Sequence, residues 1–314
     1  SPNLAKEMHV GHLRTTLIGD TMARVFEYQG HKVIRQNHVG DWGTQFGMLI
    51  AYLDSVGTSA DDLKDLEIFY QKAKKRFDED PDFAEKSRAY VVALQQDQPE
   101  VLEKWRAFIE ISMSHCGEIY SDLNVTLRPK DTFGESQYKG TIPSIMETLS
   151  EEGLLTESNG ALCVFLDEFT DKNGEKQAVL VQKSDGGFLY ATTDLAAIRH
   201  RAHELEADRI LYFVDARQTL HFKQIFALAR KAGLCTPNLV LGHISNGAIL
   251  NKAGKPFKTR DGNTVKLADL IKESRDRAKE IFLAKNEKAD ISRVEEIANA
   301  IGIAAIRYSE LSKH

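Results

Sequence analysis

Ser1-Pro2-Asn3-Leu4-Ala5-Lys6-Glu7-Met8-His9-Val10-Gly11-His12 opens the chain and places two histidines and a glycine at the mouth of a predicted helix. The helix is indicated by apolar residues near helical spacing, with Gly30 as its stop: Leu13, Leu17, Ala23 and Phe26. His9 and His12, three apart, lie on one side of a helical turn. Gly11 allows close approach to the backbone, and a helix N-terminus favours an anion. The stretch therefore predicts a phosphate site, with two solvated or structurally satisfied histidines as the alternative.

Further along, the pattern is that of an α/β protein. Lys32–Arg35 is predicted as a short strand, and the apolar run Arg209–Asp215 suits a buried parallel strand. A helix over Leu220–Ala232 and a strand over Asn238–Ile244 complete a βαβ unit. Neither GxGxxG nor GxxxxGK[ST] is present, which disfavours a dinucleotide dehydrogenase or a P-loop NTPase.

The charge pattern divides the chain further. The highly charged residues 55–112 predict a helical insertion. Residues 142–187 predict a small α+β unit, with a hairpin turn at Asp171-Lys172-Asn173-Gly174. The expected order is 1–54, first half of the nucleotide-binding domain; 55–112, helical insertion; 113–141, its continuation; 142–187, α+β insertion; 188–250, second half; and 251–314, basic loop and helical stem.

Composition excludes several classes. Hydrophobic residues are 42% and charged residues 28% of the 314 residues, which excludes disorder and fibrous repeats. No apolar stretch reaches the roughly 18 residues of a membrane helix. Cys116, Cys163 and Cys235 form no CxxC pair, so neither a disulfide framework nor a zinc site is indicated, and a reducing, cytoplasmic setting is favoured. The formal net charge of −5 argues against a general nucleic-acid coat protein.

A basic segment bounded by glycines, Gly254–Gly262, follows the last predicted strand. Lysine and arginine within it suit phosphate binding, although an exposed basic loop is the alternative. Together with the HVGH stretch it is expected on the side of the sheet where nucleotides bind in α/β folds.

Over its whole length, 1–314, the sequence resembles the catalytic core of the arginyl-tRNA synthetase family, a class I aminoacyl-tRNA synthetase. The HVGH stretch is similar to the HIGH motif, and the other matching stretches follow in order: Ser1–Asn3 with Ala5 and Lys6, Val39–Gly47, Tyr190–Asp194, and Phe257–Arg260 as a divergent KMSK loop. The resemblance implies a Rossmann-like parallel sheet of the HUP type with a helical insertion, a small α+β insertion and a C-terminal helical stem.

The reaction implied is activation of arginine by ATP and transfer of the arginyl group to tRNA(Arg), without a protein nucleophile. By the family match, His9, Gly11 and His12 contact ATP, and Lys258, Thr259 and Arg260 close over the pyrophosphate. Pro256 disturbs the KMSK register, so Lys255 is a second candidate. Lys6 is implied to supply the positive charge that the divergent KMSK loop lacks, with a solvated side chain as the alternative. It would act beside the catalytic His9, His12, Lys258 and Arg260. His243 is expected at the ATP site or as a structural histidine, and Mg²⁺ would be held by phosphates, with no metal site of the protein's own.

An arginine pocket needs a carboxylate and neutral acceptors, because a buried unpaired guanidinium is costly. Asp194 is the expected carboxylate, with an N-cap role as the alternative. Tyr190, four residues earlier, is expected to pack the guanidinium or to be a core aromatic. Gln218 is expected to orient the same group or to lie on the surface. Asn3 is expected to hold the α-amino or carboxylate end.

Family members carry tRNA-binding domains on both sides of the core, so the sequence predicts a truncated core. We expect a cytoplasmic monomer without membrane attachment. A small nucleotidyltransferase and a synthetase-like binding module without full charging activity are the rival interpretations.

Overall fold

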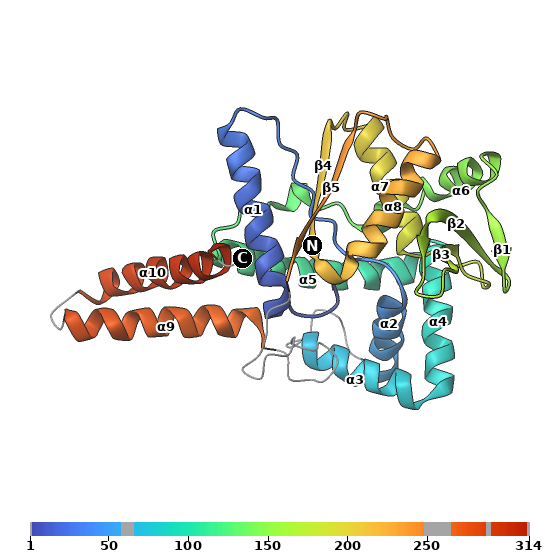
Figure 1. The fold of residues 1–314 in the computed structure, drawn as a ribbon. Coiled ribbons are helices and arrows are strands. Elements are labelled where there is room, and N and C mark those ends of the chain that lie inside the picture. Colours follow the sequence, from blue (N-terminus) through green and yellow to red (C-terminus); the bar gives the residue numbers. More distant parts are fainter. Residues whose placement is uncertain (1, 58–65, 248–264, 287–289, 313–314) are drawn as a thin grey trace. The chain divides into compact units, whose positions relative to one another are not determined.

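The computed structural model describes residues 2–57, 66–247, 265–286 and 290–312. These residues form two compact units, and both are drawn in Figure 1. The first unit joins both ends of the chain, Ser1–Gly134 and Ile249–His314, and the second is Glu135–Ala248. Among the described residues, no helix combines the length and hydropathy of a membrane span.

The first unit is mainly helical. Its described elements are η1 (Val10–His12), α1 (Leu13–Tyr28), α2 (Thr44–Val56), α3 (Leu66–Glu79), α4 (Pro81–Gln95), α5 (Pro99–Asp122), η3 (Pro129–Asp131), α9 (Leu267–Lys285) and α10 (Ile291–Leu311). The predicted first helix is confirmed, since α1 ends at Tyr28 and Gly30 has a positive φ of 87°.

Parallel pairing in the first unit falls on residues 37–40, so the predicted strand Lys32–Arg35 is wrong. Gly40 accepts a hydrogen bond from Leu4 at 2.9 Å and donates one to the Pro2 carbonyl at 3.0 Å. Asn37 forms a second parallel bridge, to Thr132. A short run of strand formers becomes a strand only where another segment pairs with it. Here the pairing segments, at Asn3 and Thr132, lie beside residues 37–40.

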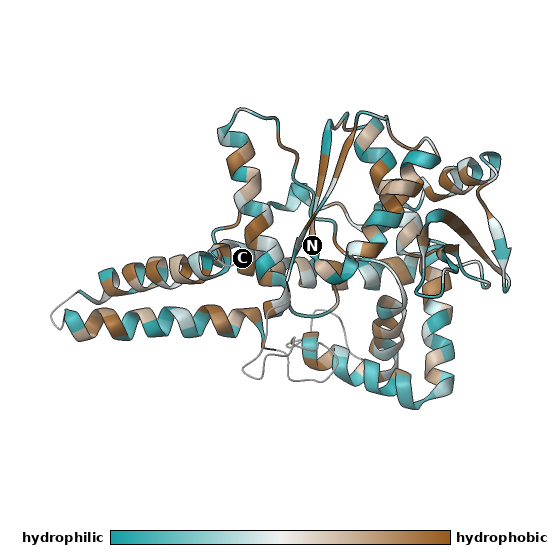
Figure 2. Ribbon diagram, viewed as in Figure 1, coloured by the Kyte–Doolittle hydropathy of each residue, from teal (hydrophilic) through white to brown (hydrophobic). Residues whose placement is uncertain are grey.

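The helices α2 to α5 share one hydrophobic core with the start of the chain. Leu4, Leu17, Phe46, Phe69 and Phe108 belong to the same buried cluster. Figure 2 shows α2 as hydrophobic over most of its length, as a helix surrounded by others should be. The region expected as a helical insertion is thus helical and packs into this core, and its status as an insertion stays a prediction.

The C-terminal region predicted as helical forms the helices α9 and α10. Ser274 of α9 donates to the Gly302 carbonyl of α10 at 2.9 Å, and Lys279 pairs with Glu295, so the two helices run antiparallel. Glu310 of α10 also pairs with Arg14 of α1 at 2.7 Å. The stem is therefore attached to the helix that follows the HVGH stretch.

The second unit contains two small sheets. Its elements are η4 (Glu135–Tyr138), α6 (Ile142–Glu151), β1 (Thr156–Ser158), β2 (Ala161–Thr170), β3 (Lys176–Gln182), α7 (Tyr190–His203), β4 (Arg209–Asp215), η5 (Ala216–Gln218), α8 (Thr219–Lys231) and β5 (Val240–Asn246). Strands β1, β2 and β3 are antiparallel, and β4 and β5 are parallel, with Arg209 opposite Val240. The predicted βαβ unit is confirmed as β4–α8–β5, and the predicted hairpin turn closes with Asp171 donating to Glu175 at 2.7 Å.

Candidate active site

His9 and His12 form a compact pair at the start of η1. Their rings stack with centroids 4.0 Å apart and planes at 27°. The Gly11 amide donates to Nδ1 of His9 at 3.0 Å, and the His9 amide donates to Nδ1 of His12 at 3.2 Å. Each imidazole is thus fixed by a backbone amide within the motif itself.

These bonds determine how the rings can act. A backbone amide only donates, so both Nδ1 atoms are acceptors and a neutral ring carries its proton on Nε2. Burial lowers the pKa of His12 well below its usual value, and neighbouring His9 acts in the same direction. His12 is therefore a neutral Nε2–H donor at neutral pH, a group that suits phosphate oxygen.

Gly11 has a role that the sequence alone did not reveal. A Cβ at this position would lie 2.7 Å from Cε1 and 2.8 Å from Nδ1 of His9. The residue therefore makes room for the His9 ring, and room for a nucleotide at Gly11 stays a prediction.

Lys6 lies on the same stretch, with its amino group 5.6 Å from the ring centre of Tyr70 in α3. The preceding residue, Ala5, is fully buried, has a φ of 79° and donates to Ser112 Oγ at 3.1 Å. A non-glycine residue at positive φ is strained, and such strain clusters at functional sites. The turn before the histidines is thus held by the core of the first unit.

Asn3 lies over the backbone of Gly40. A Cβ on Gly40 would meet the Asn3 side chain at 2.2 Å, so only glycine leaves space for it. The exposed Asn3 belongs to the same short segment as His9 and His12. Its role toward arginine stays a prediction.

Four predicted phosphate-binding residues lie outside the described residues: Lys255, Lys258, Thr259 and Arg260. The segment directly after them pairs with the HVGH stretch. Val10 donates to the Val265 carbonyl at 3.2 Å, Leu267 donates to the Met8 carbonyl at 3.0 Å, and Lys266 forms a salt bridge to Glu7 at 3.0 Å. Residues 265–267 therefore lie beside the phosphate-site candidate.

In the second unit, Asp194 is the fifth residue of α7, so the alternative that it caps this helix is wrong. Its Oδ2 lies 2.6 Å from Nε2 of His221 in α8. Tyr190 is the first residue of α7 and is 61% exposed, so it is not a core aromatic. The helix places Tyr190 and Asp194 four apart on one face.

Gln218 and His243 lie in the same unit. Gln218 is exposed and ends η5, one turn before His221. His243 of β5 has its Nε2 2.9 Å from the Val214 carbonyl, and its ring is 4.9 Å from that of Phe222. These contacts fit a structural histidine, and an ATP contact of His243 stays a prediction.

Two residues near Asp194 had not been identified from sequence. His221 has no local motif, and only the side-by-side packing of α7 and α8 brings it to Asp194. Arg201 lies seven residues after Asp194, two turns along the same helix face, and that spacing was a usable signal.

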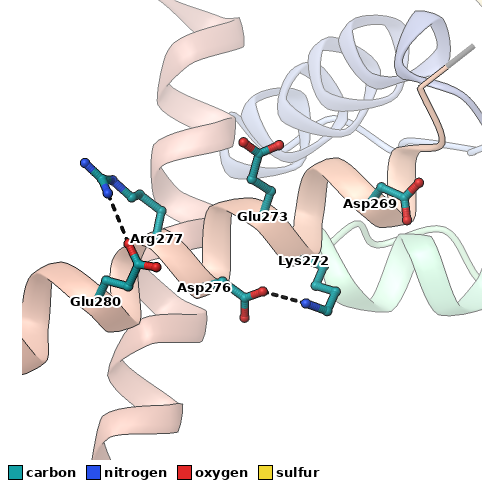
Figure 3. Close-up of a pocket in the computed structure, with 6 residues that line it drawn as sticks. All are labelled: Asp269, Lys272, Glu273, Asp276, Arg277 and Glu280. Carbon is teal, nitrogen blue, oxygen red and sulfur yellow. Dashed lines mark hydrogen bonds and ion pairs between the residues drawn. The ribbon is translucent and has the colours of Figure 1, made fainter.

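A surface hollow elsewhere has no comparable chemistry. Figure 3 shows its six labelled residues on α9, where Lys272 pairs with Asp276 at 2.6 Å and Arg277 with Glu280 at 3.0 Å. Within the described part of the chain, no three or more His, Cys, Asp and Glu side chains gather as a metal site would require.

Residues 1–314 match the family described as "tRNA synthetases class I (R), catalytic domain". The chain belongs to this family. It is 55% identical to an arginine–tRNA ligase of Stutzerimonas stutzeri over 315 residues, covering 100% of this chain and 54% of the relative. For an arginine–tRNA ligase of Hahella chejuensis the identity is 52%, covering 100% of this chain and 55% of the relative.

Solved structures agree with this assignment. The arginyl-tRNA synthetase of Plasmodium falciparum superimposes with a TM-score of 0.82 at 34% identity, covering 100% of this chain and 51% of that one. The Thermus thermophilus arginyl-tRNA synthetase shares the fold, with a TM-score of 0.74 at 22% identity over 98% of this chain and 56% of that one. The expected class I synthetase fold is confirmed. The chain spans about half the length of these relatives.

Proposed function

We propose that this chain is the catalytic core of an arginine–tRNA ligase. It would activate arginine with ATP and transfer the arginyl group to tRNA(Arg). The observation that carries the proposal is the match of all 314 residues to the arginine-specific class I catalytic domain. The fixed pair of His9 and His12 supports it, because it offers phosphate donors without a protein nucleophile.

In the first step a carboxylate oxygen of arginine attacks the α-phosphorus of ATP. A new P–O bond forms, the bond to the bridging oxygen breaks, and pyrophosphate leaves with its electron pair. The Nε2–H groups of His9 and His12 would donate to phosphate oxygens, where negative charge develops. Because backbone amides hold both rings in advance, little reorganisation is needed during the reaction.

In the second step a terminal ribose hydroxyl of the tRNA attacks the carbonyl carbon of the adenylate, and AMP leaves.

Five further residues are proposed to contact the phosphates of ATP: Lys6, Lys255, Lys258, Thr259 and Arg260. Mg²⁺ would bind phosphate oxygens and water and neutralise part of their charge. As a translation enzyme the protein would act in the cytoplasm, and we propose that it is a monomer.

For arginine recognition, Asp194 would pair with the substrate guanidinium through a charge-assisted hydrogen bond. Tyr190 would pack against the guanidinium plane, Gln218 would accept from it, and Asn3 would hold the α-amino or carboxylate group. The partly buried carboxylate of Asp194, 14% exposed, supports this assignment because desolvation strengthens such a pair.

Arginine-dependent exchange of pyrophosphate into ATP, with tRNA(Arg) added, tests the activity. Exchange with arginine and none with lysine is the expected result. A binding module without activity would bind ATP and arginine but show no exchange. Because the chain spans half its relatives' length, we expect it to charge tRNA poorly, and charging at the efficiency of a whole relative would contradict this.

The pocket assignment has its own test. Asp194→Ala should weaken arginine binding by at least about 100-fold, since the substrate guanidinium loses its charge-assisted hydrogen bond and is left without a carboxylate partner. The ATP affinity should stay within about twofold. Titration calorimetry measures both affinities. Equal arginine binding by the variant and the parent protein would show that the guanidinium is held elsewhere.

A further inference from the structure

The Asp194 carboxylate is held on one side only. Its Oδ2 lies 2.6 Å from Nε2 of His221, and within the described residues its Oδ1 takes part in no hydrogen bond. The two groups come from different helices, α7 and α8, and are 14% and 28% exposed. The carboxylate therefore has one fixed oxygen and one oxygen available to a ligand.

A second cationic group lies close by. Arg201, 7% exposed on α7, attracts Asp194 electrostatically. Its guanidinium lies 5.2 Å from the ring centre of Tyr212 in β4. Arginine is charged at every accessible pH, so Asp194 already faces one permanent positive charge inside the protein.

His221 occupies Oδ2 of Asp194 through its Nε2 atom, and Arg201 supplies a permanent positive charge nearby. The oxygen that stays open to a cationic ligand is therefore Oδ1.

We propose that His221 is a positioning residue for the arginine pocket, an inference that rests on the proposed function. Through its Nε2 atom it fixes Oδ2 of Asp194, so that Oδ1 is presented to the guanidinium of the substrate. It also restrains the carboxylate from turning along α7 toward Arg201. His221 itself does not contact the reacting atoms.

Four variants separate the hydrogen bond from mere packing, with dissociation constants for arginine and for ATP measured by calorimetry. His221→Leu removes the donor and should raise the arginine Kd about 10-fold or more, as expected for a lost bond to a charged group. His221→Gln places an amide nitrogen at the same number of bonds from Cα and should stay within about threefold of the parent. His221→Lys keeps a donor but adds charge, and it should weaken arginine at least as much as His221→Leu.

The matched control is His203→Leu, the same substitution at an exposed histidine of α7. It should leave both affinities within twofold. ATP affinity should stay within twofold in all four variants, which shows that each remains folded.

Two results overturn the positioning role while leaving the pocket in place. One is unchanged arginine affinity in His221→Leu. The other is an equal loss in His221→Leu and His221→Gln with normal ATP binding. If the parent protein and the His203→Leu control both fail to bind arginine, the proposed pocket is wrong and the role of His221 is refuted with it.

Discussion

His9 and His12 differ from a pair of surface histidines because the chain's own amides occupy both Nδ1 atoms. Protonation of either ring on Nδ1 would turn an acceptor into a donor and break a bond within the motif. The lowered pKa of His12 is the electrostatic side of the same arrangement, since burial disfavours its charged form. The motif thus offers His12 as an oriented neutral donor beside a His9 ring that the Gly11 amide holds in place.

Gly11 allows this arrangement to be tested. In Gly11→Ala the new Cβ would fall within 3.0 Å of the His9 ring, which must turn away and lose its bond from the residue 11 amide. We expect the pyrophosphate-exchange rate to fall by about 100-fold through misplaced donors. Because a side chain can move aside, the unfolding free energy should change by less than about 1 kcal/mol.

Gly117→Ala is the matched control for that substitution. Gly117 lies within α5, and among the described residues outside this helix no atom lies within 4 Å of the position that an alanine methyl group would take. Alanine should therefore fit and favour the helix. Its activity should equal that of the parent, with a gain of up to about 1 kcal/mol in stability. An exchange rate for Gly11→Ala within threefold of the parent would refute the steric role of Gly11.

At the residue scale, the sequence was enough to identify the motif but not its internal contacts. His9, Gly11 and His12 were recognisable from spacing and from the family resemblance. The clash that requires Gly11 depends on the rotamer of His9, and the Asp194–His221 contact depends on how two helices pack. Neither is encoded in a local pattern.

At the scale of elements, prediction succeeded where one face of a segment is buried. The bounds of β4 are as predicted, and α8 was displaced by a single residue at each end. The strand predicted over Lys32–Arg35 was wrong because pairing, and not propensity, determines where a ladder forms. The antiparallel pairing of α9 with α10 likewise depends on contacts between the helices, such as Ser274 with Gly302, and not on a local pattern.

The contact between α2 and α4 gives a prediction at this scale. A Cβ on Gly47 of α2 would lie 2.3 Å from the Ser87 carbonyl oxygen and 3.1 Å from the Val91 amide of α4. Backbone atoms cannot turn aside as a side chain can, so the helices must separate. Gly47→Ala should therefore lower the unfolding free energy by about 1–3 kcal/mol.

Urea denaturation measures this loss, again with Gly117→Ala as the control. Both changes add one methyl group to a helical glycine, and only Gly47 faces another helix. If the two variants are equally stable, close approach of α2 and α4 is not what requires glycine.

At the scale of the whole chain, the first unit is closed by charges from distant parts of the sequence. Asp20 of α1, 1% exposed, accepts from the Thr126 amide at 2.8 Å and its hydroxyl at 2.6 Å. It also pairs with Arg24 at 2.9 Å and with Arg307 of α10 at 3.2 Å. One carboxylate thus links the helix after the HVGH motif to the C-terminal stem.

The same carboxylate makes stability depend on pH. Burial alone would raise the pKa of Asp20, but the bonds from Thr126 and Arg24 outweigh it and hold the pKa below its usual value. A lowered folded-state pKa means that the stabilisation is present above the unfolded value of about 4 and is lost as the pH falls through the folded value. Asp20→Asn should therefore cost about 2 kcal/mol or more at pH 7, because two arginines lose their shared anion.

Urea unfolding of the parent and of Asp20→Asn at pH 7 and at several values below pH 4 measures this directly. The difference between them should shrink as the parent carboxylate becomes protonated. Asp276→Asn is the matched control, since its bond to Lys272 at 2.6 Å joins two exposed side chains and should contribute little to the unfolding free energy. A difference for Asp20→Asn that stays constant across this range would mean that the side chain acts through its shape and hydrogen bonds, and that its charge does not hold α10 to α1.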